Sequence, residues 1–97
     1  MIPVTTHVLD AARGRPAAGL EVRLGLLTAV TGVDGRAALG EVTAGVHELT
    51  FATGDWFAAL GMECFYPSVT VRFTASGAHC HVPLLLSPFA YSTYRGS

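Results

Sequence analysis

Short runs in which apolar and polar residues alternate follow one another along the chain and are separated by glycine-containing turns. A period of two places successive side chains on opposite faces of a β-strand. The apolar positions of the clearest runs are Ile2, Val4 and Val8; Leu20, Val22 and Leu24; Leu49 and Phe51; Val69, Val71 and Phe73; and Cys80, Val82, Leu84 and Leu86. The last three runs belong to predicted strands over Val46–Ala52, from Pro67 onward, and over Ala78–Leu86, with an extended tail over Tyr91–Arg95. This pattern predicts an all-β fold, a two-sheet β-sandwich.

The segments between the runs carry residues that favour tight bends. We expect turns at Arg13–Pro16, Gly32–Gly35 and Ser76–Gly77, because Gly, Pro and Asp readily adopt the backbone angles that turns require. The Asp34-Gly35 pair is also a strong β-hairpin signal.

One segment predicts a short helix, from Trp56 to about Leu60. Asp55 is a favourable N-cap for it, and Gly61 is a favourable stop. A chain of 97 residues is long enough for one domain and too short for two, so residues 1–97 are expected to form a single domain.

Charge and segment composition exclude several classes of protein. The net charge of −1 argues against nucleic-acid binding, which needs a basic stripe. No apolar run approaches the roughly 18–20 residues that cross a bilayer, and the N-terminus lacks the features of a secretory signal. We therefore expect a cytoplasmic protein with no nucleic-acid or membrane partner. Cys64 and Cys80 are expected to be free thiols that fill space.

The apolar content is high for so small a domain. Apolar residues make up 51% of the chain and charged residues 13%. A domain of this size buries only about 60–70% of the surface of its unfolded chain, so part of the apolar content must lie on the surface. Because exposed apolar area commonly marks an interface, the composition points to an oligomer.

Three histidines are predicted to point away from the core. The apolar row of the strand over Ala78–Leu86 belongs in the core, so His79, His81 and Pro83 lie on the opposite face. His7 likewise lies on the outer face of the first strand. A second copy of the chain would cover this face and supply the walls of a cleft. Pro83 cannot donate to a sheet ladder, which predicts an edge strand or a bulge.

The residues alone leave the role of these side chains open. A neutral imidazole accepts a proton near pH 7, which suits catalysis. A second interpretation is that the histidines are ordinary surface or interface residues. A third is that His79 and His81 bind zinc, with His7 as a third ligand. Arg36, which follows a turn, is by itself most simply a solvated side chain.

Three segments resemble signatures of the transthyretin-like family. They are Thr6–Asp10 with Gly14–Ala17, Thr31–Arg36 with its Asp-Gly-Arg ending, and His79–Phe89 followed by Tyr91–Ser97. The last segment is similar to the ending of the family's 5-hydroxyisourate hydrolases. Its closing Tyr-Arg-Gly-Ser separates these enzymes from the hormone carrier transthyretin, which lacks it. The resemblance runs from about Val4 to Ser97.

The resemblance implies a transthyretin-like (prealbumin-like) sandwich that forms a homotetramer around a central channel, with active sites at the dimer–dimer interface. It implies hydrolysis of 5-hydroxyisourate, the product of urate oxidation, to 2-oxo-4-hydroxy-4-carboxy-5-ureidoimidazoline, with no cofactor and no metal. Water attacks a ring carbonyl, and the adjacent C–N bond of the six-membered ring opens. The alternative function is a non-enzymatic carrier that binds a small ligand in the channel.

Five residues match functional positions of the family, namely His7, Arg36, His81, Tyr94 and Ser97. The match implies two catalytic histidines and leaves open which is the general base; His81 is favoured for deprotonating water and His7 for binding and polarising the substrate. Arg36 matches a substrate-binding arginine, whose planar fork suits carbonyl oxygens and whose charge suits an oxyanion. Tyr94 matches a substrate-binding position. Ser97 is expected to orient the substrate, the water or a histidine.

The chain departs from the family pattern in three places. Only Gly25 to about Ala29 remain of a usually longer hairpin between the strand ending near Leu24 and the Asp-Gly-Arg turn. Cys80 replaces a frequent aromatic residue between the two histidines, and Ala90 replaces a frequent glycine. The shortened hairpin bears on edge geometry and stability, and none of the three changes falls on a matched catalytic position.

Overall fold

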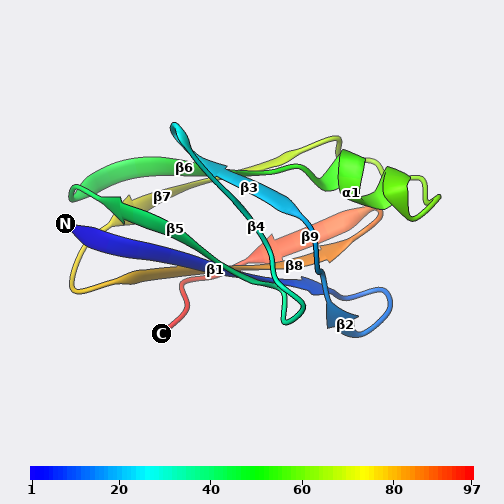
Figure 1. Ribbon diagram of the computed structural model, residues 1–97, viewed down its shortest axis with the longest axis horizontal. Helices are drawn as coiled ribbons and strands as arrows, with labels where there is room; N and C mark the ends of the chain where they lie inside the picture. The colour runs from blue at the N-terminus through cyan, green and yellow to red at the C-terminus, as the bar shows by residue number, and fades with distance from the viewer.

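A computed structural model describes residues 1–97 and contains two β-sheets packed face to face, with one short helix at an end of the sandwich (Figure 1). The first sheet comprises β1 (Ile2–Asp10), β2 (Arg15–Pro16), β5 (Arg36–Val42), β8 (Cys80–Ser87) and β9 (Ala90–Thr93). The second comprises β3 (Glu21–Leu24), β4 (Leu27–Val30), β6 (Gly45–Phe51) and β7 (Val69–Ala75), and the helix is α1 (Thr53–Ala59). The predicted all-β sandwich with one short helix is confirmed. No helix is long and apolar enough to span a membrane.

The first sheet is organised around β1 and β8, which run parallel to each other. β1 pairs on its other edge with β5 and β2, and β8 pairs on its other edge with β9. In the second sheet the strand order is β4-β3-β6-β7, and all neighbours are antiparallel. β1, near the N-terminus, and β8, near the C-terminus, are thereby hydrogen-bonded neighbours in the centre of one sheet.

The core lies between the two sheets and follows the predicted alternation. Every second residue of β1, from Ile2 to Asp10, is buried, and the apolar row of β8 faces the core as expected. Val4, Leu49 and Phe51 are completely buried. Burying one such side chain contributes about 1.5–3 kcal/mol, so the alternation determines which face of each strand turns inward.

Three strands and one connection differ from the sequence prediction. β2 lies at the end of the segment for which a turn over Arg13–Pro16 is predicted. β4 and β5 lie in segments for which no strand is predicted, and the Asp-Gly turn joins them across the two sheets instead of forming a hairpin. Gly35 makes this crossing feasible: its φ is +77°, its N–H donates to the Gly32 carbonyl, and its carbonyl accepts the Val8 N–H at 2.8 Å. The turn is therefore fixed against β1, and β5 begins beside β1.

The shortened connection after β3 forms a tight hairpin. Leu24 of β3 is opposite Leu27 of β4, so Gly25 and Leu26 are the two turn residues, and Gly25 has a φ of +60°. Leu26 is fully exposed at the tip. The missing residues are thus accommodated by an ordinary two-residue turn at the edge of the second sheet.

The helix begins earlier than predicted. It starts at Thr53 with Ala52 as N-cap, and Asp55 lies inside its first turn, where it makes no capping hydrogen bond. The Thr53 hydroxyl donates to the Tyr66 carbonyl at 2.8 Å, and the Gly54 N–H donates to the Pro67 carbonyl at 2.9 Å. These tertiary contacts anchor the first turn in place of a side-chain cap. Gly61, with φ +69°, ends the helix region as predicted.

Pro83 lies in a central strand, so of the two predicted alternatives, an edge strand or a bulge, the edge strand is wrong. β8 has β1 on one side and β9 on the other. The ladder with β9 ends at the Leu84–Thr93 pair and resumes only at an isolated bridge between His81 and Gly96. The Thr93 hydroxyl donates to the Pro83 carbonyl at 2.7 Å. Pro83 is tolerated because its missing N–H falls where the ladder is interrupted.

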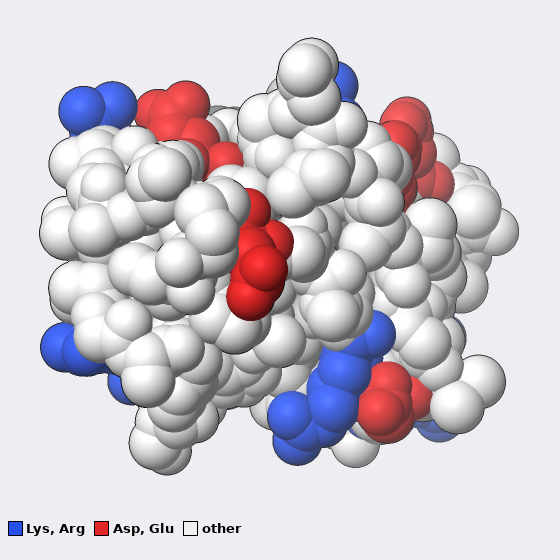
Figure 2. All heavy atoms as spheres, turned by 60° about the vertical axis from the view of Figure 1, so that its left-hand side comes forward, with Lys and Arg blue, Asp and Glu red and all other residues white.

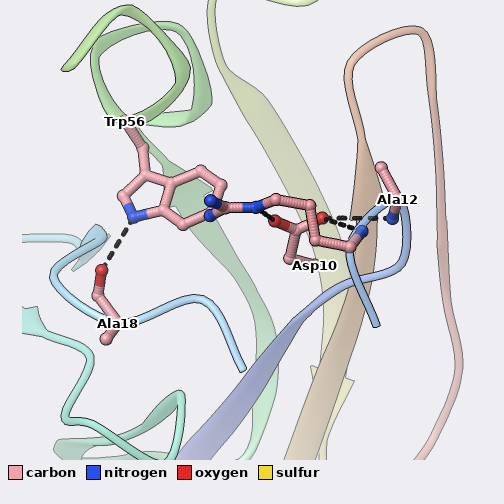
Figure 3. A network of polar contacts seen from close by, with 5 residues as sticks. Asp10, Ala12, Ala18 and Trp56 are labelled. Carbon is pink, nitrogen blue, oxygen red and sulfur yellow. Dashed lines mark hydrogen bonds and ion pairs between the residues drawn. The ribbon is translucent and has the colours of Figure 1, made fainter. Parts of the chain in front are cut away.

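A polar network ties the end of β1 to the helix (Figure 3). The buried carboxylate of Asp10 accepts hydrogen bonds from Arg13 Nε at 2.6 Å and from the backbone N–H groups of Ala12 and Arg13. The Arg13 guanidinium lies 5.8 Å from the ring centre of Trp56, whose indole N–H donates to the Ala18 carbonyl at 2.8 Å. Burial raises the pKa of Asp10, but the hydrogen bonds and the charge of Arg13 outweigh it and hold that pKa below its ordinary value of 3.8.

The surface combines scattered charges with exposed apolar side chains. Figure 2 shows acidic and basic groups dispersed over one face, without a continuous basic stripe there. Phe65, Phe89 and Tyr91 are exposed beside the β8–β9 turn, and Leu26 and Val46 are exposed on the second sheet. Part of the apolar content therefore lies outside the core, as the composition predicts. Cys64 and Cys80 form no disulfide.

Candidate functional site

A hollow of about 640 Å³ opens on the outer face of the first sheet. Its walls come from β1, from the turn before β5 and the start of β5, from the residues around the start of β8, and from the C-terminal segment. The lining residues are Thr5, Thr6, His7, Asp34, Arg36, Ala37, Ala38, His79, His81, Tyr94, Gly96 and Ser97. Every residue that the sequence singles out for function, and His79 as well, lines this single hollow.

The pairing of strands explains why these distant residues meet. His7 of β1 is opposite Arg36 of β5 in the antiparallel ladder. Thr5 of β1 is opposite His81 of β8 in the parallel ladder, and His81 in turn bridges to Gly96 of the C-terminal segment. Three strands and the tail therefore bring their outward-facing polar side chains to one place.

The turn before β5 holds both His7 and Arg36. His7 Nε2 lies 2.9 Å from the Asp34 carbonyl oxygen, and because a carbonyl only accepts, Nε2 must donate. In the neutral ring the lone pair is then on Nδ1. The Asp34 carboxylate accepts the Arg36 backbone N–H at 3.0 Å. One turn thus determines the tautomer of His7 and the starting position of Arg36.

His81 is the half-buried titratable group of the hollow. Its Nδ1 lies 2.8 Å from the Thr5 hydroxyl oxygen. Burial lowers the pKa of His81 below its ordinary 6.5, and the positive charges of Arg36, His7 and His79 lower it further. A hydrogen bond that the ring donates to the Thr5 backbone opposes this shift. The ring is therefore neutral near pH 7 and able to accept a proton.

Arg36 has no carboxylate partner. The two ion pairs of the structure join Arg13 to Asp10 and Arg72 to Glu48. The guanidinium of Arg36 is exposed and lines the hollow, and it forms no ion pair there. An unpaired guanidinium beside a neutral imidazole combines an anion-stabilising group with a proton acceptor.

The hollow does not contain a preformed metal-ligand set. No group of three or more His, Cys, Asp or Glu side chains is arranged to hold a metal ion. His7, His79 and His81 line the same hollow, but the contacts of His7 and His81 are with the Asp34 carbonyl and the Thr5 hydroxyl. The zinc alternative therefore gains no support from their arrangement.

Two lining residues that contact His81 were not recognised as functional from the sequence. Thr5 lies two positions before His7 on the same face of β1, and this period-two spacing is a signal that could have identified it. Gly96 lies within the closing Tyr-Arg-Gly-Ser, next to a candidate serine, and a glycine has no side-chain group that would indicate a role. Both contact His81.

Comparison with known proteins gives a consistent result. The model of the HIUase/Transthyretin family matches residues 4–96. The chain is 48% identical to the 5-hydroxyisourate hydrolase of Mesorhizobium japonicum, over 97% of this chain and 91% of the relative. Their alignment spans 113 positions, whereas this chain has 97 residues, so the relative carries residues that this chain lacks.

Solved structures agree with the sequence comparison. The 5-hydroxyisourate hydrolase of Klebsiella pneumoniae superposes with a TM-score of 0.94, at 38% identity over 100% of both chains. Sea bream transthyretin in complex with thyroxine superposes with a TM-score of 0.89, at 28% identity over 96% of this chain and 93% of that chain. With the fold and nearly the whole chain matched, this protein belongs to the HIUase/transthyretin family.

Proposed function

We propose that the protein hydrolyses 5-hydroxyisourate to 2-oxo-4-hydroxy-4-carboxy-5-ureidoimidazoline, a step of urate breakdown. The observation that carries the proposal is the convergence of His7, Arg36 and His81 in one hollow, with a neutral imidazole beside an unpaired guanidinium. Nearly full-length relatives that bear the name 5-hydroxyisourate hydrolase support the same activity.

The reaction begins with water activated by His81. The water oxygen forms a bond to a ring carbonyl carbon, and its proton passes to the imidazole. The carbonyl oxygen becomes an oxyanion, which the guanidinium of Arg36 stabilises. The adjacent C–N bond of the six-membered ring then breaks, and the leaving nitrogen takes the proton from the imidazolium. His81 returns to its neutral form with all atoms and charges balanced.

The other matched residues bind and orient the substrate in this scheme. His7, with Nε2 bound to the Asp34 carbonyl, presents Nδ1 as its free ring nitrogen. Tyr94 is an exposed phenol on the wall of the hollow and binds the planar ring. Ser97 orients the water or the substrate. No step of this scheme draws on a metal or an organic cofactor.

The proposed assembly is a homotetramer whose sites lie at the contact between dimers. The hollow is open to solvent, so another copy is needed to enclose the substrate. β9 pairs only with β8, leaving its other edge unpaired, and the aromatic side chains of Phe89 and Tyr91 are exposed beside it. Exposed strand edges and apolar patches favour association. Sedimentation is expected to show four chains per particle; a monomer with full activity would contradict the proposal. We also propose that the protein is located in the cytoplasm.

A small-ligand carrier is the second candidate, favoured by the likeness to a transthyretin bound to thyroxine. The hollow opposes this function, because histidines and an arginine line it where a hydrophobic hormone needs apolar walls. A thyroxine titration separates the two candidates. Tight binding without hydrolysis of 5-hydroxyisourate would favour the carrier.

The test is the decay of freshly generated 5-hydroxyisourate, followed by ultraviolet absorbance. Arg36→Ala is expected to reduce kcat by about 10²–10³, the typical loss when an oxyanion donor is removed. Arg72→Ala is a matched control, since Arg72 is an exposed arginine on the second sheet that does not line the hollow. Equal rates for both variants would contradict the role of Arg36.

A further inference from the structure

The His81 ring is held from two sides by residues that have no place in the reaction scheme. On one side the Thr5 hydroxyl oxygen lies 2.8 Å from Nδ1. Thr5 and His81 are direct partners in the parallel β1–β8 ladder, so the strand pairing places Thr5 beside His81. No residue other than Thr5 hydrogen-bonds to the ring, and Nε2 is left as the nitrogen available for proton uptake.

On the other side Gly96 lies directly against the ring. A Cβ built on Gly96 would be 2.5 Å from Cδ2 of His81 and 3.1 Å from Cγ. The first distance is shorter than real Cβ atoms show, and the second is rare. Cδ2 is the ring carbon bonded to Nε2. The Gly96 N–H also donates to the His81 carbonyl at 2.8 Å, so the tail cannot move away without losing that bond.

The backbone of Gly96 does not itself require glycine. Eight other glycines have positive φ, and Gly96 is not among them. A residue with a side chain could therefore adopt its backbone conformation. What opposes a side chain is His81, through its ring at 2.5 Å and, less severely, through its carbonyl oxygen at 3.1 Å. The close approach of the His81 ring is therefore the main reason why a glycine occupies position 96.

We propose that Thr5 and Gly96 are positioning residues that hold the His81 imidazole in the orientation and tautomer in which Nε2 accepts the proton from water. The proposal deepens the hydrolysis proposed above and depends on it for its kinetic consequence. Thr5 acts through its hydroxyl, and Gly96 acts through the absence of a side chain.

The tautomer follows from the inventory of donors. If Nδ1 carries the proton, it donates to the Thr5 hydroxyl oxygen, and Nε2 has a free lone pair. The same hydrogen bond persists after Nε2 takes up a proton, because the imidazolium keeps Nδ1–H. If Thr5 instead donated to Nδ1, Nε2 would carry the proton and could not act as a base. The catalytic cycle is therefore compatible with Thr5 only as an acceptor.

The first test measures the tautomer directly, independently of activity. Nitrogen-15 resonances of the imidazole separate a protonated ring nitrogen from a bare one. For His81 of the intact protein near pH 7 we expect a bare Nε2 and a protonated Nδ1. Thr5→Val should give a mixture of tautomers, and Thr5→Ser, which keeps the hydroxyl, should restore the original pattern. A protonated Nε2 in the unaltered protein would overturn the proposal.

The second test separates kcat from KM. Thr5→Val is expected to lower kcat by roughly 10- to 100-fold, part of the 10²–10⁴ that a positioned general base supplies, with KM little changed because Arg36 still binds the substrate. Thr5→Ser should recover most of the rate. Thr28→Val is the matched control, on the exposed edge strand β4. A Thr5→Ser variant as slow as Thr5→Val would show that the hydroxyl is not what matters.

Gly96→Ala tests the other side of the ring. It should lower kcat to a similar extent and shift the His81 ring resonances, whereas Gly14→Ala, in a turn with no atom within 4 Å of the added Cβ, should do neither. Circular dichroism verifies that both variants are folded. If Gly96→Ala keeps the kcat and resonances of Gly14→Ala, the steric role is refuted.

The two proposals fail in different ways. If the unaltered protein does not accelerate the decay of 5-hydroxyisourate, the proposed function falls, while the tautomer pattern still decides whether Thr5 and Gly96 hold the ring. If the unaltered protein and Thr28→Val are active but Thr5→Val is equally active, only the positioning role falls.

Discussion

Gly35 is the residue at which a single methyl group should damage both the fold and the site. Its φ of +77° lies in the left-handed region, and it is buried between β1 and the segment that begins at Pro16. A Cβ at this position would lie far inside 3.0 Å of the Val8 carbonyl oxygen, and it would be 3.1 Å from Pro16 Cβ. Both neighbours belong to paired backbone or a rigid ring, so neither yields easily.

The expected loss of stability has two parts. Placing alanine in the left-handed region costs roughly 1–2 kcal/mol. The clash with the Val8 carbonyl adds about 1–3 kcal/mol, the usual range for overpacking a well-filled site. Gly14→Ala isolates the first part, because Gly14 has φ +69° and no atom within 4 Å of an added Cβ. The reduced chain entropy of the unfolded state is common to both variants and cancels.

Urea unfolding followed by circular dichroism measures both variants. Gly35→Ala should be less stable than Gly14→Ala by about 1–3 kcal/mol. It should also lose activity where Gly14→Ala does not, since the turn that holds His7 and Arg36 must shift. Equal unfolding free energies for the two variants would show that the turn is not packed against β1 as described.

Three further results are expected. The value of kcat/KM should fall toward acid pH with a midpoint below 6.5, because the reaction requires neutral His81 and the pKa of His81 is lowered. Arg36→Gln removes a positive charge that repels the imidazolium, so it should move that midpoint upward. The carboxylate of Asp10 stabilises the fold above its unfolded-state pKa, and this stability is lost as the pH falls through the lower folded pKa. Asp10→Asn should therefore reduce the free energy of unfolding at pH 7 by roughly 1–3 kcal/mol. It should also make the free energy of unfolding depend less on pH in the acid range. Leu84→Ala, which empties a fully buried position of β8, should reduce the free energy of unfolding by about 2–5 kcal/mol in the same urea assay, and a loss below 1 kcal/mol would contradict the described core.

The strands with a clean alternation were predictable from the sequence, and those without it were not. β1 and β8 have a buried residue at every second position, with Pro83 of β8 buried in addition, and this pattern alone fixes which face of each strand turns inward. β4 has no fully buried residue, and β5 buries only Leu39 and Val42, with a register shift where β1 passes from Val4 to Thr5. Their pairing depends on neighbours distant in sequence, which periodicity does not report.

The same limit applies to the hollow. The period of two correctly predicted that His7, His79 and His81 point away from the core. That they lie close together depends on the parallel pairing of β1 with β8. Resemblance to a family supplied Arg36, Tyr94 and Ser97, whose side chains no local pattern connects to the histidines. Contacts such as that of Gly96 with the His81 ring are purely steric, and they become visible only with coordinates.

Hydrolysis at this hollow is tested most directly by comparing two histidine variants in the absorbance assay with freshly generated 5-hydroxyisourate. His47 is a control, since it lies on β6 with its Nε2 bound to the Thr43 carbonyl and does not line the hollow. The unaltered protein and His47→Ala should accelerate the decay equally, and His81→Ala should lose about 10²–10⁴ of that acceleration. Decay that His81→Ala accelerates as fully as the unaltered protein would contradict catalysis by this site.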